Sequence, residues 1–246
     1  MSCKARTALV TGATGGIGEA VALSLAKKGY NVVVHFHKNA EKAQNLVNEI
    51  KKYSNALAIQ ADLSKECEIE KLFLSARAYF SKIDTVVTCA GIAHYGSFES
   101  TKEEDFDRLV NVNVKGTLMC VKHALSDMYK LNYGRVVCIS SIWGEVGASQ
   151  EVLYSATKSA ISGFVKALAK ETADSGITVN AVSPGVVDTN MLNHFSSSDK
   201  DYLLSQIPVG RFASSNEVAS LVSFLCSEDA EYITGEIMGL NGGFGK

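Results

Sequence analysis

Proline is scarce in this chain, with only two among 246 residues, and no low-complexity stretch marks a linker. We therefore expect one domain over residues 1–246. No segment reaches the roughly 18 uncharged apolar residues of a membrane helix, and the first residues lack the apolar core of a signal peptide. The net charge is −2 and no block of Lys or Arg occurs, which argues against a nucleic-acid-binding protein. A cytoplasmic protein that binds neither membrane nor nucleic acid is expected.

Closely spaced cysteines are also missing. Because no C-x-x-C pair or similar metal spacing occurs, we expect reduced thiols that pack as small apolar groups and no metal site. The six cysteines are Cys3, Cys67, Cys89, Cys120, Cys138 and Cys226.

Short Val- and Ile-rich runs alternate with longer helical patterns along the whole chain. The runs are nearly continuous in apolar character, as strands covered on both faces should be. The alternation predicts an α/β Rossmann fold, a doubly wound seven-stranded parallel sheet flanked by helices. Residues at about 186–210 interrupt the rhythm and are interpreted as a substrate lid loop. The expected strands are 7–10, 31–35, 56–60, 85–88, 135–140, 178–183 and 236–240, and the expected helices are 16–28, 40–52, 65–80, 103–129, 155–174 and 216–227.

A glycine-rich turn follows the first expected strand and precedes the first helix. It reads Gly-x-x-x-Gly-x-Gly from Gly12 through Gly16 to Gly18. Gly12 permits a tight turn, Gly16 lets the backbone approach a pyrophosphate, and Gly18 lets the helix pack closely on the sheet. Free amides at the helix N-terminus favour phosphate. This context favours a dinucleotide site over a plain structural turn.

The end of the second expected strand bears on which dinucleotide binds. NAD sites place an acidic residue there for the ribose 2′-hydroxyl, but this chain has His35, His37 and Lys38 instead. NADP(H) is therefore favoured over NAD(H), although these residues are also typical of a solvated strand end. Asp62, after the third strand, is placed to accept from an adenine amino group or to cap the next helix.

Tyr154 and Lys158 are four residues apart in a helix-forming stretch, which places both on one helical face. An ammonium beside a phenol lowers the phenol pKa, so the pair is a candidate proton donor or acceptor. The same spacing occurs by chance on many solvated helices, and the surrounding motifs must decide.

Those motifs occur in the order found in the short-chain dehydrogenase/reductases, which the chain resembles along essentially its whole length. The glycine turn, Asn113, Ser141, Tyr154-x-x-x-Lys158 and Pro184-Gly185 carry the resemblance. Two further stretches, Ile207-Pro208-Val209-Gly210-Arg211-Phe212 and Leu240-Asn241-Gly242-Gly243, look most like 3-oxoacyl-[acyl-carrier-protein] reductases of fatty acid biosynthesis.

The resemblance implies a catalytic set of Tyr154, Lys158, Ser141 and Asn113. Tyr154 would protonate the carbonyl oxygen while NADPH delivers hydride, and Lys158 would lower the pKa of Tyr154 and hold the nicotinamide ribose. Ser141 would position the substrate oxygen, whereas its neighbour Ser140 points the other way. Asn113 would order a water that relays protons to Lys158. The implied cofactor-binding residues are Gly12, Thr14, Gly15, Gly16, Ile17, Gly18, His35, His37, Lys38, Asp62, Leu63, Cys89, Ala90, Gly91, Tyr154, Lys158, Pro184, Gly185, Val187 and Thr189.

The expected substrate pocket suits a medium-sized carbonyl compound, because apolar and aromatic residues dominate it. Its expected residues are His94, Tyr95, Trp143, Glu145, Val186 and the segment from Met191 to Phe195. His94 is interpreted as part of the wall rather than as a general base.

Two departures from the family pattern bear on the substrate and the site. Cys89 replaces the usual second Asn of an Asn-Asn-Ala-Gly run and cannot make an amide's hydrogen bonds. Asn132 and Ser175 stand where the acyl-carrier-protein reductases have docking arginines, which weakens the prediction of an acyl carrier protein as partner.

The favoured function is NADPH-dependent reduction of a carbonyl, with a 3-oxoacyl thioester as the first substrate expected. The alternative is an NAD(P)-dependent dehydrogenase of another small alcohol, sugar or ketone. A dinucleotide-binding sensor without chemistry is the third hypothesis, against which the intact Ser141, Tyr154, Lys158 and Asn113 argue. The resemblance also implies a homotetramer.

Overall fold

A single parallel sheet of seven strands forms the centre of the computed structural model, which describes residues 5–189, 192 and 195–245. Its strand order is β3-β2-β1-β4-β5-β6-β7, and every neighbouring pair is parallel. The order reverses at β1 and β4, which creates the crevice where ligands bind in such sheets. The strands are β1 (Thr7–Thr11), β2 (Asn31–Phe36), β3 (Ala56–Gln60), β4 (Thr85–Thr88), β5 (Gly134–Ile139), β6 (Ile177–Pro184) and β7 (Ile237–Leu240).

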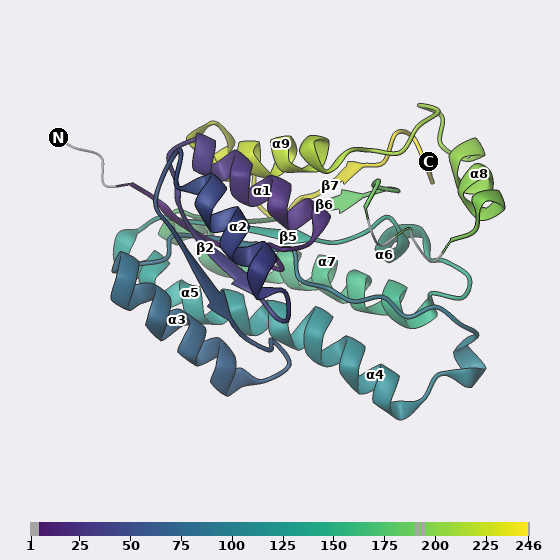
Figure 1. Ribbon diagram of the computed structural model, residues 1–246, viewed down its shortest axis with the longest axis horizontal. Coiled ribbons are helices and arrows are strands. Elements are labelled where there is room, and N and C mark those ends of the chain that lie inside the picture. The colour runs from purple at the N-terminus through teal and green to yellow at the C-terminus, as the bar shows by residue number, and fades with distance from the viewer. Residues whose placement is uncertain (1–4, 190–191, 193–194, 246) are drawn as a thin grey trace.

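Helices cover both faces of the sheet, as the alternating pattern predicted (Figure 1). One face carries α1 (Gly16–Lys27), α2 (Ala40–Ile50) and α9 (Ser215–Leu225). The other carries α3 (Glu66–Phe80), α5 (Thr117–Leu131) and α7 (Val152–Thr172). The predicted Rossmann fold is confirmed.

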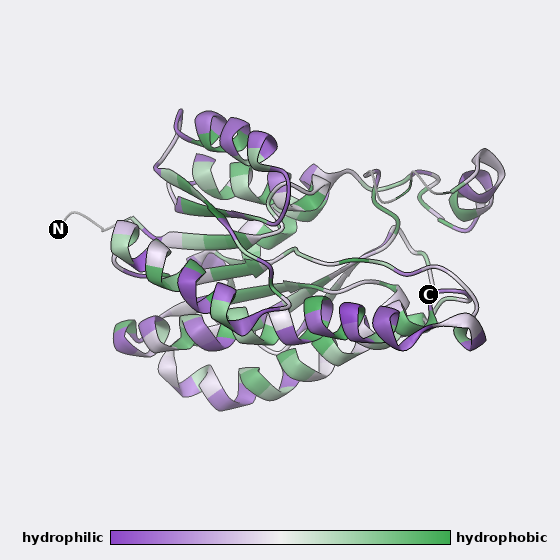
Figure 2. Cartoon of the chain, turned by 60° about the horizontal axis from the view of Figure 1, so that its bottom comes forward, coloured by the Kyte–Doolittle hydropathy of each residue, from purple (hydrophilic) through white to green (hydrophobic). Residues whose placement is uncertain are grey.

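Each face of the sheet packs on its own hydrophobic cluster. Along β1, Ala8 and Val10 belong to the cluster beneath α1, whereas Leu9 belongs to the cluster beneath α3 and α5. This alternation follows from the two-residue period of a strand and explains why both positions are apolar. Figure 2 shows hydrophobic strands inside and helices with hydrophilic outer surfaces.

The helix expected over residues 103–129 differs from the prediction. It consists of α4 (Glu103–Leu109), a π-helical segment η2 (Val110–Gly116) and α5. A π-turn holds one residue more than an α-turn and often marks a functional site. Here it surrounds Asn113, whose side chain bonds residues outside the helix.

The expected lid loop contains a helix that the periodicity did not predict. Helix α8 (Ser197–Ser205) begins with a capping box in which Ser196 and Asp199 bond each other's backbone N–H groups. A four-residue helix, α6 (Trp143–Val146), follows β5. Both lie at the end of the molecule opposite the N-terminus (Figure 1). Among the residues described, no helix combines the length and apolar character needed to cross a membrane.

Candidate active site

The glycine turn lies between β1 and α1 and fits the pyrophosphate of a dinucleotide. Gly12 has φ +62°, and a Cβ there would come within 2.7 Å of the Ala90 Cα. At Gly18 a Cβ would collide with the Gly12 carbonyl oxygen, so the absent side chain permits the close helix packing that was predicted. Gly16 differs from the prediction in part, because the Thr189 side chain occupies the space that a Cβ would need. The free amides at the start of α1 complete an anion site.

A groove runs from this turn across the carboxyl ends of β1 to β4. All fourteen expected cofactor residues of the first half of the chain line it, including the three from β2 and its end. Sequence reasoning missed Arg108, Asn111 and Val112, which enter the groove from α4 and η2. Their only sequence signal is that they lie just before Asn113. The other expected cofactor residues, Tyr154, Lys158, Pro184, Gly185, Val187 and Thr189, line a second pocket that joins the groove at Ile17, Cys89, Gly91 and Thr189.

His35 has a different role from the phosphate-attracting one expected of it. It is 2% exposed, and its Nδ1 accepts a hydrogen bond from the Gly12 N–H at 3.0 Å. Nε2 therefore carries the proton and donates to the Ala61 carbonyl oxygen, also at 3.0 Å. Burial lowers the pKa of His35 to about 4, so the ring is neutral near pH 7 and offers no charge to a 2′-phosphate. His35 instead ties the glycine turn to the end of β3.

Two exposed cationic candidates remain at the end of β2. His37 and Lys38 are exposed and line the groove. Asp62, on the neighbouring strand end, accepts hydrogen bonds from both the Ser64 N–H and the Ser64 hydroxyl. Burial acts to raise the pKa of Asp62, but these two bonds outweigh it and the pKa is lowered. The Asp62 carboxylate thus stabilises the turn that precedes α3, and Asp62 also lines the groove.

Tyr154, Lys158 and Ser141 converge in the second pocket. Tyr154 and Lys158 lie on the buried face of α7, with the Lys158 Nζ 5.6 Å from the Tyr154 ring centroid. The Lys158 ammonium donates to the Ile139 carbonyl oxygen at 2.8 Å, which fixes it at the end of β5. Ser141 follows the same strand and lines the same pocket, and its side chain is close enough to Tyr154 to act on the pKa of the phenol. The two hydroxyls that a carbonyl oxygen would need are therefore adjacent.

The pKa values of the pair differ from the expectation that Lys158 lowers the pKa of Tyr154. Burial raises the pKa of Tyr154, the nearby Glu151 carboxyl raises it further, and only the Ser141 side chain lowers it. Burial lowers the pKa of Lys158 to about 8. Tyr154 is consequently protonated near pH 7, which is the state required to donate a proton to a carbonyl oxygen.

Asn113 and Ser140 both support the site through the backbone. The Asn113 amide accepts from the Ile92 N–H, donates to the Ile92 carbonyl oxygen and donates to the Thr157 hydroxyl. These bonds join η2 to the segment after β4 and to α7. The Ser140 hydroxyl donates to the Lys158 carbonyl oxygen at 3.1 Å, although Ser140 also belongs to the pocket lining.

Cys89 lies where the groove and the pocket meet. Burial raises the pKa of its thiol to about 12, although the nearby Lys158 acts in the opposite direction. The thiol is therefore protonated and inert near pH 7. Its neighbour Ala90 receives the support that fixes this turn, because the Ala90 N–H donates to the Thr11 hydroxyl at 3.1 Å.

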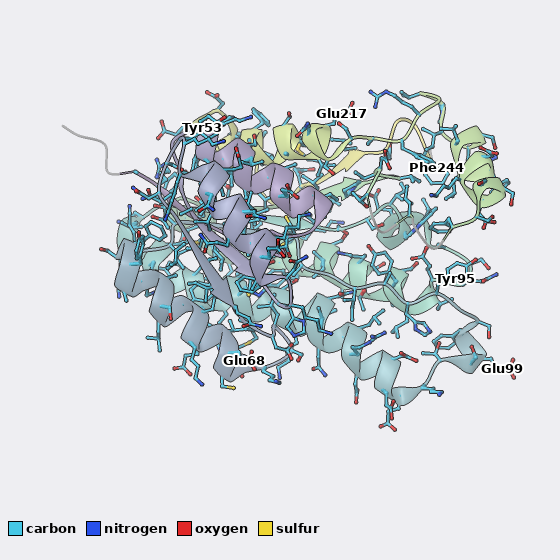
Figure 3. All side chains as sticks on the ribbon, viewed as in Figure 1. Tyr53, Glu68, Tyr95, Glu99, Glu217 and Phe244 are labelled. Carbon is cyan, nitrogen blue, oxygen red and sulfur yellow. The ribbon has the colours of Figure 1, made fainter. Side chains whose placement is uncertain are left out.

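The substrate end of the pocket is lined by Trp143, Val186, Leu192, Phe195 and Leu203, with the last three from the expected lid. Trp143, Val186, Leu192 and Phe195 were expected there, the last two as part of the segment from Met191 to Phe195, whereas Leu203 was not. Tyr95 and Phe195 pack edge to face at 6.1 Å, which connects the segment after β4 with the lid. Figure 3 shows Tyr95 and Phe244 at the same end of the molecule as α8.

Several other expected pocket residues differ or fall outside the description. Tyr95 is absent from the pocket lining, and Asn193 and His194 lie outside the described residues. His94 is absent from the pocket lining and lies 3.7 Å from an Asp105 carboxylate oxygen on α4. Glu145 is exposed on α6 and is also absent from the lining. Met191 lies outside the described residues. Glu151, which sequence reasoning missed, lines the pocket three residues before Tyr154.

Comparison with known proteins agrees with this geometry. The profile of the enoyl-(acyl carrier protein) reductase family matches residues 12–245. The chain is 43% identical over 241 residues to the uncharacterized oxidoreductase YmfI of Bacillus subtilis, covering 97% of this chain and 98% of that protein. It is 38% identical over 239 residues to the 3-oxoacyl-[acyl-carrier-protein] reductase FabG of Staphylococcus aureus, covering 97% of each. The Aquifex aeolicus FabG is 40% identical over 240 residues, which is 97% of this chain and 96% of that protein.

Proposed function

Because the chain belongs to the short-chain dehydrogenase/reductase family and is a nicotinamide-dependent oxidoreductase, we propose that it reduces a carbonyl to a secondary alcohol with NADPH. The observation that carries the proposal is that Ser141, Tyr154 and Lys158 line one pocket, which opens into the dinucleotide groove. A 3-oxoacyl thioester is the first substrate to test, in view of the two FabG relatives.

Each residue of the site has a separate role in the proposed carbonyl reduction. The bound nicotinamide supplies hydride to the carbonyl carbon. The Ser141 hydroxyl donates a hydrogen bond to the substrate oxygen and fixes its position beside Tyr154. Tyr154 donates its proton to that oxygen as negative charge develops there. Lys158 holds positive charge near the phenolate that forms, which favours the proton transfer.

NADPH rather than NADH is proposed from the charge at the end of β2. No carboxylate follows that strand, and the exposed His37 and Lys38 line the groove beside it. An anionic 2′-phosphate would meet one permanent cation there, Lys38, while the Asp62 carboxylate lies on the neighbouring strand end. Because His35 is buried and neutral, this preference rests on fewer charges than the sequence suggested.

The domain organisation and the oligomeric state are also proposed. We take residues 1–246 as one domain, with residues 186–210 as a lid, since Leu192, Phe195 and Leu203 of that segment line the pocket. A homotetramer is proposed from the family, and gel filtration with light scattering tests it.

The test is oxidation of NADPH or NADH by the purified protein with acetoacetyl-CoA, crotonyl-CoA and a panel of simple ketones. Reduction of acetoacetyl-CoA with NADPH, lost in Tyr154→Phe while NADPH still binds, supports the proposal. Faster turnover with NADH would overturn the cofactor assignment. Crotonyl-CoA is included as a control because the matching family profile is that of enoyl-(acyl carrier protein) reductases. If crotonyl-CoA alone is reduced, the reaction is enoyl reduction and the proposed carbonyl reduction is wrong.

A second candidate, a dehydrogenase of another small alcohol, sugar or ketone, is favoured by one observation. Asn132 ends α5 in a left-handed conformation, φ +46°, and Ser175 lies in the turn after α7, so neither supplies the cation that an acidic carrier protein requires. Good turnover of free ketones without any of acetoacetyl-CoA would select this candidate.

A further inference from the structure

Glu151 is a carboxyl group inside the substrate pocket that the mechanism above does not use. It is 9% exposed and lines the pocket with Ser141, Tyr154 and Lys158. The residue stands at the N-cap of α7, where a carboxylate usually bonds the first amides of the helix. Its side chain makes no such capping bond. The carboxyl therefore does not bond the first amides of α7, and Glu151 lines the cavity instead.

The protein supplies little to balance this carboxyl. Burial raises the pKa of Glu151, and the neighbouring Trp143 side chain acts in the opposite direction. Within the described part of the chain, no Lys, Arg or His forms an ion pair with it. Lys158, the cation among the described pocket-lining residues, bonds the Ile139 carbonyl oxygen instead. Acceptor capacity thus remains inside the pocket, where leaving it unused is costly.

Glu151 also lies close to the reacting groups. Its charge raises the pKa of Tyr154, so the carboxyl and the phenol interact electrostatically. A group that bonds Glu151 must accordingly sit near the carbonyl that Tyr154 protonates. An anionic group at that place would be repelled, and an alkyl group would leave the carboxyl unpaired.

We propose that Glu151 is a specificity-determining residue that accepts a hydrogen bond from a hydroxyl group carried by the substrate close to its reducible carbonyl. The inference rests on the proposed carbonyl reduction and narrows its substrate to hydroxylated carbonyl compounds, free or as thioesters. The Trp143 side chain neighbours the carboxyl, and the substrate hydroxyl completes its hydrogen bonding. An unsubstituted 3-oxoacyl chain does not meet this demand.

The kinetic test compares matched ketones that differ by a hydroxyl against a methyl. Hydroxyacetone is paired with butan-2-one, and 4-hydroxybutan-2-one with pentan-2-one, so two distances from the carbonyl are sampled. The ratio of kcat/KM within each pair is measured for the native protein, Glu151→Gln and Glu151→Leu. Comparing one ratio across variants cancels the intrinsic reactivity of the ketones and the fraction of folded protein.

For at least one pair, the hydroxyl preference is expected to fall roughly ten- to hundredfold in Glu151→Leu and by less in Glu151→Gln, which keeps an acceptor. Glu145→Gln, which changes an exposed carboxyl on α6 outside the pocket lining, should leave the ratio unchanged. Equal ratios in all four proteins for both pairs would overturn the inference.

A binding measurement decides the inference even if no ketone is turned over. Trp143 is the single tryptophan of the chain and lines the same pocket as Glu151, so its indole N–H gives one ¹⁵N NMR signal that reports on a ligand bound there. With NADP⁺ present, propane-1,2-diol should shift this signal at roughly tenfold lower concentration than butan-2-ol, and Glu151→Leu should remove the difference. Equal titrations of the native protein by both alcohols would contradict the assignment. If the diol preference holds but neither ketone is reduced, the proposed function fails while the hydroxyl site stands.

Discussion

Replacement of His35 tests whether a buried imidazole, rather than a surface cation, occupies the end of β2. In His35→Leu the Gly12 N–H and the Ala61 carbonyl lose their partners, which are 3.0 Å away on either side of the ring. An unpaired buried group costs about 1–3 kcal/mol, so a loss of about 2–5 kcal/mol in the free energy of unfolding is expected near pH 7. NADPH binding should weaken as well, because Gly12 begins the phosphate turn.

The same residue also makes stability depend on pH. A histidine in the unfolded chain has a pKa near 6.5, whereas burial lowers the pKa of folded His35 to about 4. As the pH falls through 6.5, the unfolded state therefore takes up a proton that the folded state refuses, and stability declines until about pH 4. Between pH 7.5 and pH 5 these values correspond to a loss of about 2 kcal/mol.

Urea unfolding followed by circular dichroism at both pH values measures this contribution. In His35→Gln, whose amide can accept and donate but does not titrate, the loss between pH 7.5 and pH 5 should be smaller by about 2 kcal/mol. His37→Gln alters an exposed neighbour and serves as the matched control. The reasoning is refuted if His35→Gln keeps the full pH dependence, or if His35→Leu is as stable as the native protein.

Three further predictions concern single residues of the site. Ser141→Ala should lower kcat/KM by about 10²-fold. Ser140→Ala removes one hydrogen bond to the backbone, so it should lower the free energy of unfolding by about 1 kcal/mol and change activity little. Equal losses of kcat/KM in the two variants would contradict the role given to Ser141. Gly12→Ala should lower the unfolding free energy by more than about 2 kcal/mol, because its Cβ meets Ala90 at a positive φ, and a normal melting curve would contradict this. Cys89 lines the groove, yet it should resist alkylation by iodoacetamide at pH 7.5 in the folded protein because desolvation raises its thiol pKa to about 12, and rapid labelling detected by mass spectrometry would contradict this raised pKa.

Much of the fold could be predicted because it depends on local patterns. The strands expected over 56–60 and 85–88 have those bounds in the structure, and the other five differ by one residue at one or both ends. Continuous Val- and Ile-rich runs predict strands covered on both faces, and the intervening helical periods predict the crossovers. The fourteen cofactor residues gather in one groove for a related reason, since parallel strands bring their carboxyl ends to one edge.

The features that could not be predicted from the sequence depend on contacts between distant segments of the chain. His35 stands within an apolar run, unlike His37 and Lys38 after it, but its partner Gly12 is 23 residues away. The π-helical turn at Asn113 arises from bonds to Ile92 and Thr157, and no local periodicity encodes them. In the sequence, Glu151 resembles an ordinary N-cap residue. Only the folded structure shows that its side chain makes no capping bond and that the residue lines the pocket.

The π-helical turn between α4 and α5 shows how this sequence can change in length without turning the helix that follows. A π-turn holds one residue more than an α-turn, so deletion of one residue within η2, with the turn closing to regular α-helix, would leave the orientation of α5 about its axis nearly unchanged. The buried face of α5, which includes Cys120, Val121, Ala124 and Met128, would still pack against the sheet. The deletion would instead remove the extra residue of the turn around Asn113, so the bonds of Asn113 to Ile92 and Thr157 hold the residue count of this segment.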